Sequence, residues 1–187
     1  YAYFLIPSLK SKKLLLNSRP TEPMMENVLE LAEKKSYKEI LKHFDFAQEK
    51  INKIIFRIIK NKDKIFTHCH STNVINALIY AKKHGKKFEV YNTETRPLFQ
   101  GRKTATQLKK AGIKVTMFVD SALAVAIEKE NKQDNFFADK IFLGADALLK
   151  NGIINKVGSH LIAEVSKIHK IPLFIVADSW KFTKKKV

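Results

Sequence analysis

Residues 65–91, IFTHCHSTNVINALIYAKKHGKKFEVY, contain the pattern that decides the fold class. A short apolar run, Ile65-Phe66-Thr67, precedes a stretch with helical spacing over residues 72–84, and a second run, Phe88-Glu89-Val90-Tyr91, follows it. A helix between two such runs predicts a strand–helix–strand unit, in which the crossover connection makes the two strands parallel. This stretch therefore predicts an α/β fold.

The same alternation continues to the end of the chain. Strands are predicted at residues 115–119, 141–143 and 173–176, and amphipathic helices at residues 101–111, 121–131 and 156–169. We therefore predict a Rossmann-like, mostly parallel sheet with helices on both faces.

The first third of the chain has a different composition. All six glycines lie at residue 85 or later, and helical spacing covers residues 24–35 and 37–60, with Pro20 and Pro23 marking a helix entry. We predict a small helical N-terminal domain over residues 1–62, incomplete at its start because the chain opens on Tyr1 rather than Met. The Rossmann-like α/β domain is predicted to span residues 63–187.

Composition argues against several classes of protein. A hydrophobic share of 45% in 187 residues supports a packed core and excludes global disorder. No apolar run is long enough for a membrane span, and no secretory signal is visible. A single cysteine excludes a disulfide framework and a multi-cysteine zinc site, and it is typical of the reducing cytoplasm, where we expect the protein to act.

The charge is strongly positive, with 35 basic and 18 acidic residues and a net charge of +17. Two interpretations stay open: a solvated, lysine-biased surface, or attraction of a polyanion such as nucleic acid or a phosphorylated small substrate. Gly101-Arg102-Lys103-Thr104 lacks the earlier glycine of a P-loop, and no GxGxxG occurs. The sequence therefore argues against nucleotide hydrolysis and against a nicotinamide or flavin site.

Polar residues gather directly after the predicted strands, where parallel α/β sheets bind their ligands. We take these strand ends as the candidate site. In chain order they are His68-Cys69-His70-Ser71, Thr93-Glu94-Thr95-Arg96-Pro97, Asp120-Ser121, Gly144-Ala145-Asp146 and Asp178-Ser179-Trp180-Lys181.

Cys69, the only thiol, has three interpretations. It is a small buried apolar residue, or it is a reactive thiol whose pKa is lowered by a helix N-terminus and by the flanking His68 and His70. The third interpretation is a metal site. Adjacent strand residues point to opposite faces, however, so the three side chains do not converge on one ion without a sharp turn.

Two aspartates also have a structural and a chemical interpretation. Asp146 either caps a turn, or has a pKa raised by its place at the mouth of an apolar sheet and transfers protons near neutral pH. Asp120, followed by Ser121, fits a helix N-cap.

Arginine is rare in this chain, which uses lysine almost everywhere. Arg19, Arg96 and Arg102 are candidates for bidentate binding of a phosphate or carboxylate, with internal ion pairs such as Arg96–Glu94 as the alternative. Asn155-Lys156, next to Gly158-Ser159, combines an amide, an ammonium group and a helix start, which together suit an anion.

Short strings that recur in one protein family run through the chain in order. They are Ser18-Arg19-Pro20-Thr21, Thr67-His68-Cys69-His70-Ser71, Thr93-Glu94-Thr95-Arg96-Pro97, Gln100-Gly101-Arg102, Val119-Asp120-Ser121-Ala122, Gly144-Ala145-Asp146, Asn151-Gly152, Asn155-Lys156-Val157-Gly158 and Lys181-Phe182. The chain resembles the family that unites ribose-1,5-bisphosphate isomerase, methylthioribose-1-phosphate isomerase and the alpha, beta and delta subunits of translation initiation factor 2B. The first and second strings look closest to the ribose-1,5-bisphosphate branch.

This resemblance implies an activity and a set of functional residues. The activity is an aldose–ketose isomerisation, from ribose 1,5-bisphosphate to ribulose 1,5-bisphosphate in AMP salvage, without a metal or a cofactor. The initiation-factor subunits usually lack the cysteine–aspartate pair, so the resemblance implies Cys69 as proton acceptor and Asp146 as proton donor. The residues expected to hold phosphate or sugar hydroxyls are Arg19, Ser71, Arg96, Asn155, Lys156 and Lys181.

The resemblance also implies partners and an alternative. We expect a homo-oligomer, a dimer or a dimer-based hexamer, that assembles through the α/β domain, and no membrane partner. The alternative is a non-catalytic regulatory subunit or a nucleotide or sugar-phosphate sensor, for which nucleic acid or a translation factor is the partner. The family's Arg-Gly-Ala phosphate loop would precede Tyr1, and the turn between Asp146 and Asn155 is one residue shorter than the usual spacing.

Overall fold

The computed structural model describes residues 2–5, 7–18, 22–128 and 136–184. Its centre is a five-stranded, fully parallel sheet in the order β3-β2-β1-β4-β7. The strands are β1 (Lys64–Thr67), β2 (Glu89–Thr93), β3 (Lys114–Phe118), β4 (Lys140–Leu143) and β7 (Leu173–Ile175). The predicted Rossmann-like fold class is confirmed, and each predicted strand lies within two residues of its observed bounds.

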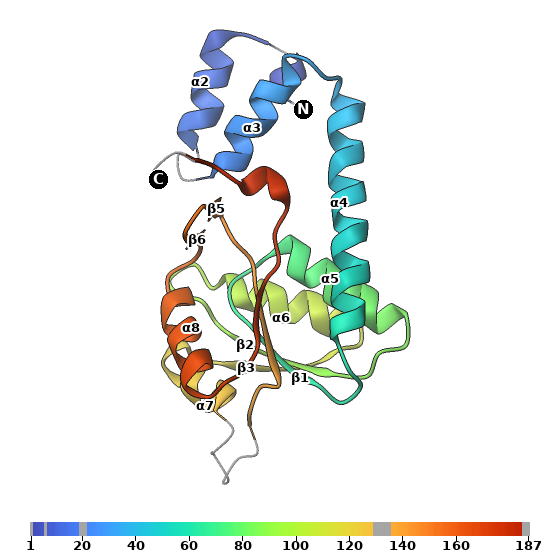
Figure 1. Cartoon of the computed structure of the whole chain (residues 1–187), viewed down its shortest axis with the longest axis vertical. Coiled ribbons are helices and arrows are strands. Elements are labelled where there is room, and N and C mark those ends of the chain that lie inside the picture. The colour runs from blue at the N-terminus through green and yellow to red at the C-terminus, as the bar shows by residue number, and fades with distance from the viewer. Residues whose placement is uncertain (1, 6, 19–21, 129–135, 185–187) are drawn as a thin grey trace.

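Helices cover both faces of this sheet (Figure 1). One face packs on α4 (Tyr37–Ile58), α5 (Thr72–Lys83) and α6 (Gln100–Lys110), and the other on α7 (Leu123–Ile127) and α8 (Ser159–Ile168). Alternation along β1 explains the two layers, since Ile65 is buried in the first cluster and its neighbour Phe66 in the second. The strands are therefore apolar on both sides, as a central parallel sheet requires.

The N-terminal helices form a separate group at one end of the molecule (Figure 1). They are α1 (Ala2–Leu5), α2 (Leu9–Ser18) and α3 (Pro23–Ala32). Helix α4 begins beside them with a capping box, in which Ser36 and Glu39 satisfy each other's backbone N–H groups. Its last turn buries Ile55, and the following Ile59 is also buried in the sheet core. Helix α4 thus connects the two parts, and a domain boundary at residue 62 stays a prediction.

Two regions differ from the sequence prediction. A 3-10 turn (Asp120–Ala122) and the short α7 stand in place of the long helix predicted at 121–131, of which residues 129–131 lie outside the described part of the chain. A hairpin of β5 (Ala147–Leu149) and β6 (Gly152–Ile154) was not predicted beyond its Asn-Gly turn. Three-residue strands are too short to show a period in sequence.

The strand order places a crevice between β1 and β4. The chain moves from β1 outward through β2 and β3, and then returns to the other side of β1 with β4. At such a reversal the loops that leave the two neighbouring strands diverge, and ligands of open α/β sheets bind there. The segments after β1 and β4 carry Cys69 and Asp146.

The C-terminal segment returns across the sheet to the N-terminal helices (Figure 1). Its 3-10 turn (Ser179–Lys181) is held by Asn27 of α3, whose amide donates to the carbonyl oxygens of Trp180 at 2.6 Å and Phe182 at 3.1 Å. This contact brings the N-terminal helices and the strand ends to the same crevice.

Candidate active site

The loop after β1 holds Cys69 in an uncommon backbone conformation. Its φ angle is 65°, in the left-handed region that residues other than glycine rarely adopt. Two threonine side chains hold its peptide groups: the Cys69 N–H donates to Thr95 Oγ1 at 2.9 Å, and the Thr104 hydroxyl donates to the Cys69 carbonyl at 2.7 Å. This loop therefore makes the sharp turn that a continuing strand would not.

His68 connects the same loop to the segment that carries Lys156. Its Nε2 lies 2.8 Å from the Val157 carbonyl, which can only accept, so Nε2 carries a proton, and its Nδ1 lies 2.5 Å from Thr93 Oγ1. Burial lowers the pKa of His68. Gly158 allows this contact, since its φ is +98° and a Cβ there would lie 3.1 Å from the imidazole. His68 is thus a buried, neutral support.

Asp146 lies after the end of β4 and directly before the β5–β6 hairpin. Its backbone N–H donates to the Ile154 carbonyl at 2.8 Å, which closes the base of the β5–β6 hairpin. Gly144, two residues earlier, packs so closely that an added Cβ would lie 2.6 Å from Ser71 Oγ. The loops after β1 and β4 therefore touch each other at one point beside the crevice, between Gly144 and Ser71.

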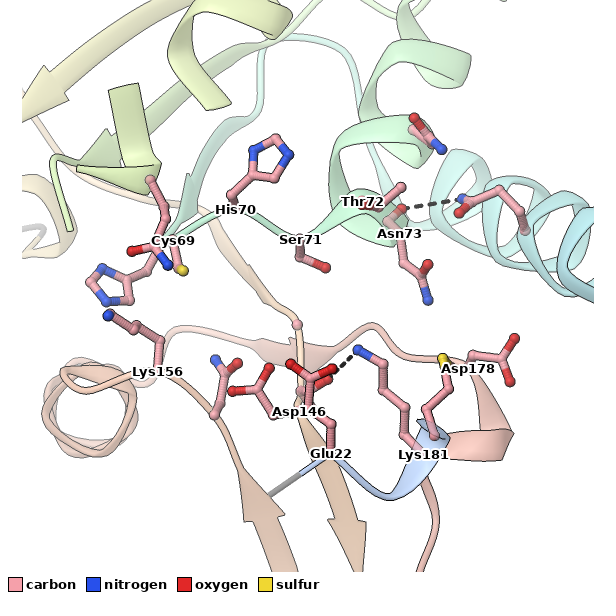
Figure 2. A pocket seen from close by; sticks show the side chains of 18 of the residues that line it. Glu22, Cys69, His70, Ser71, Thr72, Asn73, Asp146, Lys156, Asp178 and Lys181 are labelled. Carbon is pink, nitrogen blue, oxygen red and sulfur yellow. Dashed lines mark hydrogen bonds between the residues drawn. The ribbon is translucent and has the colours of Figure 1, made fainter. Parts of the chain in front are cut away.

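These loops enclose a cavity of about 790 Å³. Figure 2 shows Cys69, His70 and Ser71 on one wall and Lys156, Asp146 and Lys181 on the facing wall. The cavity brings together six of the eight predicted site residues: Cys69, Ser71, Asp146, Asn155, Lys156 and Lys181.

Helix starts and hydrogen bonds orient several of these side chains. Ser71 is the N-cap of α5, and Asn155 donates to Ser159 Oγ, at the first turn of α8, at 2.8 Å. The Lys181 ammonium group donates to the Ala145 carbonyl at 2.5 Å. Two helix N-termini and three lysines (Lys103, Lys156 and Lys181) thus border the cavity, an arrangement that suits an anionic ligand.

The two remaining predicted residues are not placed there. Arg96 is exposed and does not line the cavity; its guanidinium lies 4.9 Å from the centre of the Phe99 ring. Arg19 falls outside the described residues. A third arginine, Arg102, pairs with Glu94 at 2.6 Å, the kind of internal ion pair weighed as an alternative for the arginines.

The predicted effect on the Cys69 thiol is wrong in sign. Burial raises the pKa of Cys69, and Asp146 adds to this, while a hydrogen bond from the His70 N–H and the charge of Lys156 oppose it incompletely. The flanking histidines do not help, because burial lowers the pKa of both His68 and His70 and leaves them neutral near pH 7. The thiol is protonated at neutral pH.

Asp120 does more than cap a turn. Its carboxylate accepts the backbone N–H groups of Thr95 and Arg96, each at 2.7 Å. Burial alone would raise the pKa of Asp120, but these hydrogen bonds outweigh it, and the net shift is downward. Asp120 is therefore a charged anchor for the loop after β2.

The sequence analysis did not predict several of the residues that line the cavity. The N-cap of α3 contributes Glu22, α4 contributes Phe44 and Gln48, and α5 contributes Asn73 and Asn76. Only the asparagines carried a readable signal, because two amides three residues apart interrupt an otherwise apolar helix face. In the described part of the chain, no three His, Cys, Asp or Glu side chains are grouped so that they could hold a metal ion.

Comparison with models of known protein families shows which family the chain belongs to. Residues 7–187 match the model of the initiation factor 2 subunit family. The chain belongs to the initiation factor 2 subunit family. Members with different functions are similar to it. It is 34% identical to the ribose 1,5-bisphosphate isomerase of Archaeoglobus fulgidus over 91% of this chain and 57% of that protein. It is 33% identical to the alpha subunit of translation initiation factor eIF2B of Dictyostelium discoideum over 84% of this chain and 46% of that protein.

A solved structure shares the fold of this chain. The crystal structure of the Pyrococcus horikoshii translation initiation factor eIF-2B superposes with a TM-score of 0.85 at 24% identity, over 95% of this chain and 66% of that one. The present chain spans just over half the length of the Archaeoglobus isomerase. No described helix is long and apolar enough to cross a membrane.

Proposed function

We propose that this chain catalyses an aldose–ketose isomerisation, converting ribose 1,5-bisphosphate to ribulose 1,5-bisphosphate. The observation that carries the proposal is the placement of Cys69 and Asp146 in one cavity, on facing walls, beside Lys156 (Figure 2). The similarity to the Archaeoglobus isomerase supports the same reaction.

The reaction needs two proton-transfer groups and no external oxidant. Asp146, in its protonated form, donates to the ring oxygen as the ring opens. Cys69 takes the proton from C2 in its thiolate form, which is the minor form near neutral pH because burial raises the pKa of the thiol. In the second half Cys69 returns its proton to C1, and the Asp146 carboxylate takes the proton of the C2 hydroxyl. Carbon 1 is reduced, carbon 2 is oxidised, and both side chains end in their starting states. We therefore propose a reaction independent of metal and redox cofactor.

The groups around this pair are suited to hold the phosphates. Lys156 and Lys181 supply positive charge, and Asn155 and Ser71 supply polar groups at the starts of α8 and α5. We keep Arg19 and Arg96 as proposed substrate ligands. Arg96 would reach the substrate only if its loop moved, because its guanidinium now lies over Phe99.

We also propose that the protein acts as a homo-oligomer in the cytoplasm. Val157, Leu161 and Ile168, just before and along α8, are exposed large apolar side chains in the α/β part of the chain. Apolar side chains repeated on one side of a helix are typical of a subunit contact.

The deciding experiment is a turnover assay on the chain as it stands, with phosphorus-31 NMR to separate ribose 1,5-bisphosphate from ribulose 1,5-bisphosphate. Cys69→Ser and Asp146→Asn are expected to lower kcat by a factor on the order of a hundred or more. Glu49→Gln, an exposed carboxylate paired with Lys53 on α4, is the matched control and should keep wild-type turnover. Wild-type turnover in either site variant would overturn the roles assigned here.

A second function is favoured by the similarity to the Dictyostelium initiation-factor subunit. In this alternative the same cavity binds a sugar phosphate or nucleotide without converting it. A folded wild-type chain that binds ribose 1,5-bisphosphate by calorimetry, but forms no ribulose 1,5-bisphosphate, would support the binding module over the enzyme.

A further inference from the structure

Both peptide groups of Cys69 are held by threonine hydroxyls from two other segments. Thr95, in the loop after β2, accepts the Cys69 N–H, and Thr104, on α6, donates to the Cys69 carbonyl. Each threonine is only 1% exposed. A buried hydroxyl that binds a backbone group is shielded from competing water, so these two contacts restrict the φ and ψ angles of Cys69.

Thr95 is itself held in place by Asp120, which lies just after the end of β3. Its φ is 61°, a left-handed conformation like that of Cys69, and its N–H donates to Asp120 Oδ1 at 2.7 Å. The second carboxylate oxygen of Asp120 accepts from the next residue, Arg96. A continuous path of hydrogen bonds therefore runs from the end of β3, through the loop after β2, to the peptide of the thiol residue.

Thr104 is held by the close packing of α6. Gly101 packs so tightly on the end of β2 that an added Cβ would lie 1.7 Å from the Thr93 carbonyl oxygen. The buried Asn92 amide donates to the Gly101 carbonyl at 2.9 Å and holds that turn of the helix. Thr104, one turn later, is thereby brought beneath the Cys69 carbonyl, where its oxygen also hydrogen-bonds His70 Nδ1 at 3.1 Å.

We propose that Thr95 and Thr104 are positioning residues that hold Cys69 in its left-handed backbone conformation and so aim its thiol into the cavity. Neither side chain lines the cavity, so each acts through Cys69. The catalytic consequence depends on the proposed isomerase function, whereas the effect on the thiol does not. Without the two contacts, Cys69 relaxes toward the common regions of φ and ψ, and its sulfur moves out of its half-buried place.

Thiol reactivity tests the proposal without any substrate, because Cys69 is the only cysteine in the chain. The rate of alkylation by iodoacetamide is measured against pH in Thr95→Val and Thr104→Val, which remove the hydroxyl and keep the shape. The ionisable groups that face the thiol are His68 and His70 on its own loop, Asp146 after β4 and Lys156 before α8. The substitutions replace none of these residues, and they remove two contacts to the histidines: Thr104 Oγ1 to His70 Nδ1 at 3.1 Å and Thr95 Oγ1 to His68 Nδ1 at 3.5 Å.

Burial is the largest cause that raises the thiol pKa, so a released side chain should titrate at lower pH. We expect the midpoint of the alkylation profile to shift downward in both valine variants. Thr95→Ser and Thr104→Ser, which keep the hydroxyl, should restore the wild-type midpoint. Thr106→Val on the same helix is the matched control, since its hydroxyl binds only Arg102 on the exposed side of α6.

Turnover gives a second readout. In the valine variants we expect kcat for ribose 1,5-bisphosphate to fall roughly tenfold to a hundredfold, with KM within about twofold, because the misplaced group is the base and not a phosphate ligand. If a valine variant does not fold by circular dichroism, the alanine variant at the same position replaces it.

Wild-type alkylation profiles in folded Thr95→Val and Thr104→Val would overturn the proposal, and so would serine variants that behave like the valine ones. A chain that shows the expected alkylation shifts but forms no ribulose 1,5-bisphosphate would support the positioning role and remove the isomerase. Failure of the positioning role can therefore be distinguished from failure of the isomerase function.

Discussion

Trp180 lies flat against His43, with ring centroids 3.5 Å apart and ring planes 1° from parallel. The same imidazole hydrogen-bonds the buried Asp178 carboxylate through Nε2 at 3.0 Å. Asp178 and Lys181 both line the cavity, so His43 of α4 helps to hold the segment that forms this wall, together with Asn27 of α3. Helix α4 is thus coupled to the site by a ring stack and a hydrogen bond.

We expect His43→Leu to lower the free energy of unfolding by about 1–3 kcal/mol, because the buried Asp178 loses a hydrogen-bond donor. Trp180 is the only tryptophan, so its fluorescence during urea denaturation measures the change at this contact. His160→Leu, an exposed histidine on α8, is the control and should change the value by less than about 0.5 kcal/mol. Identical midpoints in His43→Leu and wild type would show that the contact contributes nothing.

Gly144→Ala should disturb the site through Ser71. The new Cβ would lie 2.6 Å from Ser71 Oγ and 2.7 Å from Ser71 Cβ, so the α5 N-cap must move. We expect a loss of about 1–3 kcal/mol of stability in thermal denaturation, together with reduced turnover. Gly152→Ala, in the β5–β6 hairpin, meets nothing within 4 Å and serves as the control. Equal melting temperatures for the two variants would contradict the tight contact.

The burial of His68 predicts a pH dependence of stability. Its pKa is lowered in the folded chain, so the unfolded chain binds a proton first as pH falls through the ordinary value of about 6.5. The stability that His68 contributes is therefore fully present above that value and declines as pH falls toward the folded pKa. We expect urea denaturation at pH 7.5 and 5.5 to show a smaller drop in His68→Gln than in wild type. A drop of the same size would assign the pH dependence to other groups.

The environment of Cys69 predicts opposite effects of its two charged neighbours. Asp146 raises the thiol pKa and Lys156 lowers it. The midpoint of the alkylation profile should accordingly shift to lower pH in Asp146→Asn and to higher pH in Lys156→Ala, starting from a wild-type midpoint above the ordinary thiol value of about 8.5. Shifts in the same direction would show that the thiol lies outside the influence of one neighbour.

Lysine and arginine at the proposed phosphate site should differ in their effect on binding. We expect Lys156→Ala to raise KM for ribose 1,5-bisphosphate roughly tenfold to a hundredfold, the size of a lost charged hydrogen bond. Arg96→Ala should change KM by less than about threefold unless its loop closes on the substrate. A large effect of Arg96→Ala would support the role predicted from sequence and would require that loop movement.

The strand-end rule accounts for the part of the site that sequence predicted. Cys69 and Asp146 each follow a central strand, and neighbouring parallel strands bring such ends together whatever the intervening chain does. Arg96 also follows a strand, yet Asp120 holds its backbone and Phe99 lies beneath its guanidinium. Such loop contacts depend on tertiary partners that no local pattern encodes.

The cavity residues from α3 and α4 and the direction of the thiol pKa shift were not predicted, because both depend on tertiary packing. Glu22, at the start of α3, and Gln48, on α4, reach the cavity only because these helices lie beside the strand ends in the folded chain. The local string around Cys69 shows two histidines and a helix start, which favour a thiolate, but it does not show how deeply the loop is buried. Desolvation then decides the direction of the shift.

The return of the C-terminal segment to α3 has a consequence for biosynthesis. Asn27 is synthesised 153 residues before Trp180, whose carbonyl group it binds. A growing polypeptide on the ribosome therefore carries an open-sided pocket until the segment with Trp180 and Phe182 has emerged. Ligand capture should accordingly begin only after that segment has been made.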